Sequence, residues 1–207
     1  MKSYQIVPGT LMLAAALAAC SSQAVVAEPQ PSPSADPTDT AGPKVYTSQI
    51  TEEAQARLLL DTAFSFDSTG LEPQIEEDEH QTSIRFDGAG EDFYLVEFSE
   101  RYDYPATVYH MDPTGTDPAD DGWFDEGMIA VAQDFVSEVY GVDCAEAAVT
   151  AYSYGGKTAV ELAPAEGGSF AVSFDGQSET PCGVRFATEA GAFRRAAERQ
   201  FQVKDYL

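Results

Sequence analysis

The chain has 207 residues, of which 35 are acidic and 11 are basic, giving a formal net charge of −24 at pH 7. A surface this negative repels nucleic-acid phosphates and anionic lipid headgroups, which excludes nucleic-acid binding. Three explanations of the acidity remain: solubility, including adaptation to a salty medium that screens the repulsion, cation binding, and docking to a basic partner.

The N-terminus has the layout of a secretion signal. One lysine, Lys2, precedes an apolar run over 11–19, and small residues lie just before Cys20. The apolar run is about half the ~20 residues that a membrane-spanning helix needs. The sequence therefore predicts a signal peptide over 1–19. No later segment is long and apolar enough to span a membrane, so we expect the folded part in water outside the cytoplasm.

The end of this segment, Leu17-Ala18-Ala19-Cys20, resembles the lipobox of bacterial lipoproteins. The resemblance implies cleavage before Cys20, a diacylglyceryl group on its thiol and acylation of the new amino terminus. Each buried methylene contributes about 0.8 kcal/mol, so two or three acyl chains anchor a protein almost permanently. The resemblance thus implies a lipid-anchored, extracytoplasmic protein on the cell membrane or outer membrane. An ordinary signal peptide with a chance cysteine is the alternative.

A proline-rich segment follows, and with the lipidated Cys20 it covers residues 20–43. Five prolines lie there among Ser, Thr, Ala and Asp. Such a segment has too little apolar surface to offset the entropy lost on ordering. We expect a tether reaching at most roughly 70 Å, at about 3.1 Å per residue where it is polyproline-like. Residues 45–207 then form an acidic domain, or two small ones, able to bury a substantial core.

Hydrophobic periodicity predicts both helices and strands within 45–207. Helices are expected over 49–61 and 126–140 and from Glu189 onward, because apolar residues recur there at helical spacing after acidic or capping residues. Strands are expected over the alternating segments 62–66, 82–87, 93–99, 106–110, 148–154, 157–163, 169–174 and 182–187. The predicted fold class is α+β, with one or more antiparallel sheets and about three packed helices.

The sequence also suggests an internal duplication. At an offset of 88 residues, nine positions are identical without gaps, including Thr62-Ala63 on Thr150-Ala151 and Phe86-Asp87-Gly88 on Phe174-Asp175-Gly176. A fixed offset of this kind is typical of repeated supersecondary units. The interpretation is two α+β units, over 51–100 and 126–188, although the helices that precede the strands do not match at this offset.

Two cysteines remain after the lipobox, Cys144 and Cys182. An even pair in an oxidising compartment predicts a disulfide. Closing a loop of about 38 residues would stabilise the fold by roughly 4 kcal/mol in the chain-entropy model. A redox-active pair is the alternative, but such pairs usually have C-x-x-C spacing, which is absent here.

The segment 112–125 is the best candidate for an ion site. Its five aspartates are Asp112, Asp117, Asp120, Asp121 and Asp125. Calcium binds six to eight oxygens from carboxylates and carbonyls. Aligned on Gly122 as an EF-hand glycine, the loop has Ala119 and Met128 where oxygen ligands are required, so it is not an EF-hand. The alternative is an acidic turn that caps the 126–140 helix. No other cofactor is indicated.

Two features are candidate partner-binding groups. Trp123 is either a core residue or an exposed anchor for a partner. Arg194, Arg195 and Arg199 cluster on the last predicted helix. There they form either a partner site or a solvated face whose positive charges suit the helix dipole and the acidic surface.

Catalytic motifs are weak. Ser153 lies in Ala-Tyr-Ser-Tyr-Gly, close to the nucleophile elbow, but a strand rather than a helix is predicted to follow. Both histidines, His80 and His110, precede Ser153, whereas an elbow needs its partner histidine later in the chain. Paired carboxylates for glycoside hydrolysis remain open, since acids are abundant.

The leading hypothesis is a lipid-anchored extracytoplasmic module of the bacterial cell envelope that binds or scaffolds another envelope protein without catalysis. A carboxylate-based envelope hydrolase and a calcium-dependent binding protein that uses the 112–125 loop are the alternatives.

Overall fold

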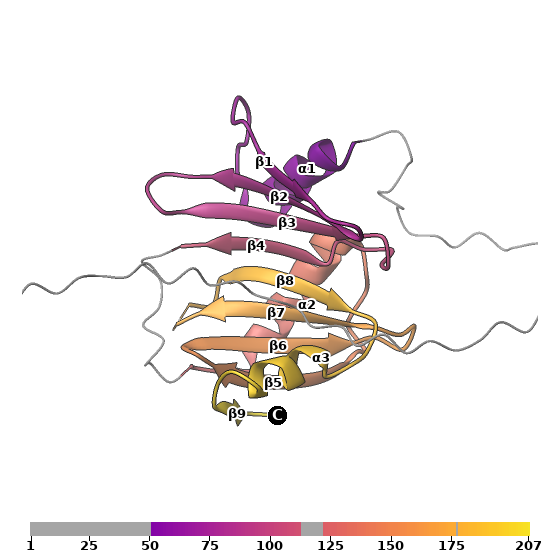
Figure 1. Cartoon of the computed structure of the whole chain (residues 1–207). Helices are drawn as coiled ribbons and strands as arrows, with labels where there is room; N and C mark the ends of the chain where they lie inside the picture. The colour runs from indigo at the N-terminus through magenta and orange to yellow at the C-terminus, as the bar shows by residue number, and fades with distance from the viewer. Residues whose placement is uncertain (1–50, 113–121, 177) are drawn as a thin grey trace, which may run out of the picture. The chain divides into compact units, whose positions relative to one another are not determined.

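The computed structural model describes residues 51–112, 122–176 and 178–207, which form three helices and nine strands (Figure 1). The helices are α1 (Glu52–Phe64), α2 (Gly127–Tyr140) and α3 (Ala192–Glu198). The strands are β1 (Gln74–Glu77), β2 (Gln81–Asp87), β3 (Phe93–Ser99), β4 (Thr107–Met111), β5 (Ala148–Tyr154), β6 (Lys157–Ala163), β7 (Ser169–Asp175), β8 (Pro181–Ala187) and β9 (Val203–Asp205).

All nine strands of the described chain belong to one antiparallel sheet, in the order β1-β2-β3-β4-β8-β7-β6-β5-β9. The predicted α+β class, with helices packed on an antiparallel sheet, is confirmed. Within the described ranges, no helix combines the length and apolarity that crossing a membrane requires.

Helix α1 begins at Glu52, inside the predicted range 49–61, and Thr51 caps it. The Thr51 side chain accepts a hydrogen bond from the Ala54 backbone N–H (3.3 Å), and two glutamates occupy the first turn. The helix continues to Phe64, so the strand predicted over 62–66 is wrong. Ala56, Leu60 and Phe64 recur every four residues and contact the core, which is helical spacing. Five residues of alternating sequence were too short to distinguish the two periods.

Helix α2 is the main core helix, as predicted. Its buried residues are Met128, Ala132, Phe135, Val136, Val139 and Tyr140. A carboxylate oxygen of Asp125 accepts a hydrogen bond from the Gly127 backbone N–H (2.7 Å) at its start. At its end Gly141 adopts a left-handed conformation with φ 68°, which glycine accommodates without steric strain.

The helices cover the two faces of the sheet unequally. Helices α1 and α2 lie behind the sheet in Figure 1, and α3 lies in front of β5 and β6. The face with α1 and α2, called the helix side, contains the large core, including Ile84, Val96, Val108 and Val172. The opposite face, called the outer face, has a small cluster in which Ala197 of α3 packs on the β5–β6 pair.

The two halves of the fold repeat one element order. Helix α1 is followed by four strands and so is α2, and the two four-stranded meanders meet at the β4–β8 pair. At this seam Val108 lies opposite Val184, and both side chains are buried. The molecule is therefore two similar helix-plus-meander units joined edge to edge.

The sequence offset of 88 residues fits only part of this repeat. It maps β2 onto β7 and β3 onto β8, which are equal in length and connection. However, it maps the end of α1 onto β5, a strand. Counted outward from the seam, β2 instead corresponds to β6. The offset therefore agrees with the structure only in the lengths of one hairpin and not in which strands are equivalent, because β2–β3 corresponds to β6–β7 in the structural repeat.

Candidate functional site

Most of the predicted calcium loop lies outside the described residues. Asp117, Asp120 and Asp121 lie outside the described residues, and Asp112 and Asp125 flank them. The Asp125 carboxylate is engaged by the start of α2, which agrees with the capping alternative. Among the described residues, no group of three or more histidine, cysteine, aspartate or glutamate side chains is arranged to hold a metal ion. Calcium binding remains a prediction from the sequence.

Trp123 packs against the helix-side core and is half-buried. Its carbonyl oxygen accepts a hydrogen bond from the Thr158 hydroxyl (2.6 Å). Next to it, Phe124 stacks on Tyr206 with ring centroids 5.3 Å apart. These contacts attach the start of α2 to β6 and to the C-terminal segment. The partial burial of Trp123 is therefore explained by packing within the domain.

Of the three candidate arginines, Arg194 joins α3 to the C-terminal strand β9. Arg194 forms ion pairs with Asp205 (2.8 Å) and Glu198 (2.8 Å). Arg195 pairs with Glu189 (3.3 Å), and Arg199 is exposed. Two of the three candidate partner-binding arginines therefore already have acidic partners within the domain.

The predicted disulfide between Cys144 and Cys182 is wrong, because both are free, buried thiols. Cys144 belongs to the helix-side core. Cys182 lies at a β-bulge, where Ser173 pairs with Gly183 and Phe174 with Pro181, which leaves Cys182 without an opposite residue. A bulge redirects its side chain, and the Cys182 thiol donates to the Ser173 carbonyl (3.3 Å). Sequence spacing could not reveal this bulge.

Cys182 lies beside a charged group on the outer face. Lys157 pairs with Asp175 (2.6 Å) and donates to the Tyr109 hydroxyl (2.5 Å). Burial raises the pKa of the Cys182 thiol to about 12 and that of Cys144 to about 11. Burial alone would lower the pKa of Lys157, but the neighbouring Cys182, Asp175 and Tyr109 outweigh it and raise the pKa. Neither thiol is therefore activated as a nucleophile.

The residues considered for hydrolase chemistry do not lie together in one site. Ser153 is a buried strand residue whose hydroxyl lies 3.4 Å from that of Tyr206. His110 instead bonds Asp92 (2.7 Å) and stacks on the Tyr94 ring, with centroids 4.3 Å apart. No described histidine contacts Ser153, so the structure places no serine-hydrolase triad there.

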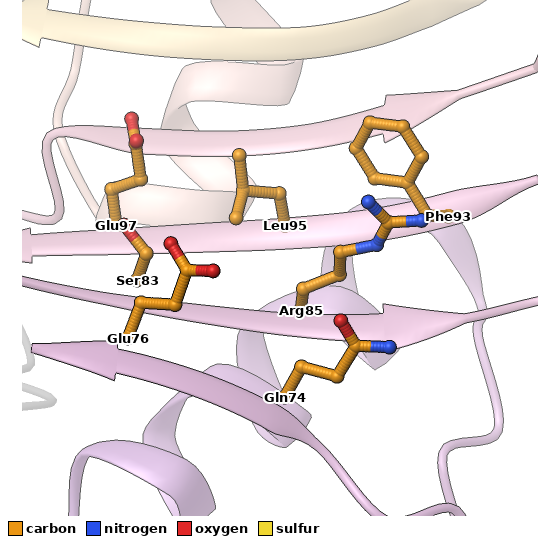
Figure 2. Close-up of a pocket in the computed structure, with 7 residues that line it drawn as sticks. All are labelled: Gln74, Glu76, Ser83, Arg85, Phe93, Leu95 and Glu97. Atoms are coloured by element: carbon orange, nitrogen blue, oxygen red, sulfur yellow. The ribbon is translucent and has the colours of Figure 1, made fainter. Parts of the chain in front are cut away.

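The outer face of the first meander contains a pocket of about 290 Å³. Its lining residues come from three neighbouring strands: Gln74, Glu76, Ser83, Arg85, Phe93, Leu95 and Glu97 (Figure 2). We call the surface formed by these seven residues the open face. Figure 2 shows Glu76 and Glu97 at one end, Arg85 against Phe93 at the other, and Leu95 between them.

Charged and apolar groups are interleaved on the open face. The Arg85 guanidinium lies 4.1 Å from the centre of the Phe93 ring and pairs with Asp87 (2.8 Å). Glu97 accepts from the Gln81 amide (2.9 Å). A site with an apolar floor, a stacked aromatic ring and fixed charges at both ends can orient a ligand without reacting with it.

Sequence reasoning did not single out the open face, although one signal was present. The segment Phe93-Tyr94-Leu95-Val96 is apolar on both faces of a strand. Only Tyr94 and Val96 pack with the helix-side core, so Phe93 and Leu95 must lie on the other face. The available signal was therefore that Phe93 and Leu95 are apolar although they lie on the face that the large core does not use.

Comparison of the chain with protein-family models, with curated proteins and with solved structures finds no match.

Proposed function

We propose that the chain is a lipid-anchored, extracytoplasmic binding module of the bacterial cell envelope. It performs no catalysis and holds its partner on the open face. The lipobox resemblance at Cys20 supports the anchor, and the proline-rich segment after it would give the domain reach. Two observations argue against nucleophilic catalysis in the described part of the chain. Both thiols have a raised pKa, and the Ser153 hydroxyl lies beside Tyr206 rather than beside a histidine.

The binding assignment depends on one observation: outer-face residues are more deeply buried in the second meander than in the first. On β6 and β7 the central outer-face residues Ala159, Glu161, Ala171 and Ser173 are all buried, and Lys157, Ala163 and Asp175 at the strand ends are half-buried. On β1, β2 and β3, by contrast, every outer-face residue is at least partly exposed. Phe93 and Leu95 are among these residues and are half-buried, and the apolar surface that they leave in water favours a partner that covers it.

The test is site-specific photo-crosslinking in living cells. A photoreactive amino acid replaces Leu95 on the open face, and a matched variant has it at exposed Glu138 on α2. We expect one crosslinked partner with the first variant and none with the second, and loss of this product in a Cys20→Ala form. Equal crosslinking from both positions, or none from Leu95, would contradict a binding site on the open face.

Catalysis is tested separately on the purified full chain. We expect no turnover in a broad panel of envelope hydrolase substrates. Turnover abolished by Glu76→Gln or Glu97→Gln, with Asp134→Asn as the control, would instead make the open face an active site.

A further inference from the structure

The two ends of the sheet differ in how their last long strand is paired. At one end β9 pairs with the outer side of β5, and at the other end no described strand pairs with the outer side of β1. Strands β1 and β5 occupy equivalent positions, each fourth from the β4–β8 seam. The free side of β5 pairs with β9, where Ser153 lies opposite Lys204. In the described chain, β1 pairs with β2 alone.

The closed edge shows what this architecture accepts. Strand β9 adds to β5 in antiparallel register, and the Tyr206 N–H continues the pairing by donating to the Ala151 carbonyl (2.8 Å). Helix α3 then packs Ala197 on the outer face beside Tyr152. The segment that supplies this cover contains four of the 11 basic residues of the chain, at 194, 195, 199 and 204. An extended strand thus completes one half of the sheet, and Arg194 and Arg195 beside it pair with acids of the same C-terminal segment.

The uncovered edge differs from the closed one mainly in charge. All four residues of β1 are exposed, and they include Glu76, Glu77 and Ile75, whose side chain is 46% exposed. More acids flank the strand at 72, 78 and 79. Strand β5, by contrast, has no charged residue. A second copy of β1 would bring glutamates against glutamates, and like charges across a strand pair are destabilising.

We propose that the partner of the open face supplies an extended, basic segment that adds to β1 as a further strand. This inference rests on the proposed function and specifies the chemistry of its partner. Neighbouring strands lie about 4.8 Å apart, so alternate side chains of the added strand would lie beside Gln74 and Glu76 at the rim of the pocket. Lysine and arginine are long enough to lie across β1 toward the open face. The backbone hydrogen bonds provide affinity, and the acidic rim selects the charge.

The probe is a fluorescent peptide of alternating lysine and valine, and its control alternates glutamate and valine. Binding to the purified full chain is measured by fluorescence anisotropy at about 0.15 M ionic strength, which screens distant charges. We expect the basic peptide to bind and the acidic one not to bind. No binding of the basic peptide would overturn the inference.

Hydrogen–deuterium exchange distinguishes strand addition from loose charge attraction. We expect the amides of 74–77 to exchange more slowly with the basic peptide bound, because paired edge amides are protected, while those of 148–154 stay unchanged. Binding without protection at 74–77 would overturn strand addition.

Charge-matched variants locate the binding. Glu76→Gln with Glu77→Gln is expected to weaken peptide binding about threefold, since the contact of Glu76 with the lysine face is lost together with the nearby charge of Glu77. The control, Asp134→Asn with Glu138→Gln, removes two exposed acids from α2 on the helix side and is expected to leave binding unchanged. Equal weakening by both pairs would show unspecific attraction and overturn the inference. If the Leu95 crosslink forms but the peptide results fail, the proposed function stands and only the basic strand is wrong.

Discussion

The two halves of the sheet have the same element order but opposite surroundings on the outer face. In the second half, α3 and β9 bury Tyr152 and Ala159 and close the β5 edge. In the first half no described element covers the equivalent strands, and the open face and the β1 edge are exposed. Within the intact sheet, the first helix-plus-meander unit is therefore covered by helices on one face only, whereas the second unit is covered on both faces.

The largest effect is expected from opening the closed edge. Removal of residues 192–207 exposes the β5 edge and the outer-face cluster, including Tyr152 and Ala159. Burying an apolar side chain contributes about 1.5–3 kcal/mol, so we expect the free energy of unfolding to fall by roughly 4 kcal/mol or more. Urea unfolding followed by Trp123 fluorescence measures this. Because an unpaired edge promotes association, size-exclusion chromatography should also show oligomers. Unchanged stability would mean that the cover is dispensable.

The seam between the halves gives the next largest effect. Val184 is 1% exposed and lies opposite Val108. Val184→Ala removes two buried methyl groups and is expected to cost about 2 kcal/mol, the sum of a transfer and a cavity contribution. Urea unfolding should shift as one transition. Two separate transitions would show that the halves are independent domains rather than one cooperative unit.

A side chain at Gly183 would disturb the centre of the outer face. A Cβ there would lie 2.4 Å from Tyr109 Cδ2, so the tyrosine ring occupies the space that the glycine leaves. Gly183→Ala is expected to cost roughly 1–3 kcal/mol by overpacking. Adding Tyr109→Ala should recover part of the loss, because the two changes act on one contact. Strictly additive effects in thermal unfolding would contradict this account.

The last effect is absent at neutral pH and appears only in alkaline solution, as a pH dependence of stability caused by the buried thiols. Unfolded cysteine loses its proton near pH 9.0, whereas burial raises the pKa of Cys144 in the folded chain to about 11. Between these values the folded state binds more protons than the unfolded state, so stability falls as the pH rises. The slope is about 1.4 kcal/mol per pH unit for each thiol. Urea unfolding from pH 8 to 11 measures this slope of the free energy of unfolding. Cys144→Ala should remove the part of the slope that the Cys144 thiol contributes.

Much of the fold follows from local pattern. The helix over 127–140 and the strands 82–87, 93–99 and 157–163 agree with prediction within a residue or two, since long apolar stripes and clean alternation are unambiguous. Between β5 and β6, Gly155 and Gly156 have φ 52° and 79°, as the tight turn of this hairpin requires. Strands β1 and β9 were missed, because four acidic and polar residues and a three-residue strand show no apolar alternation.

The candidate site was not predictable in the same way. The sequence showed apolar residues on both sides of β3, but it could not show which side α1 and α2 would cover. It also paired Cys144 with Cys182, because spacing shows neither that Cys144 lies in the helix-side core nor that Cys182 lies at a bulge.

The signal-like N-terminus, the acidic character and the helical and strand periods can be seen in the amino-acid sequence, because each depends on neighbouring residues. Which face α3 covers, which edge β9 closes and where the open face lies follow from the folded arrangement alone. These depend on contacts between segments far apart in the chain, such as Tyr152 with Asp205, whose partners no local pattern specifies.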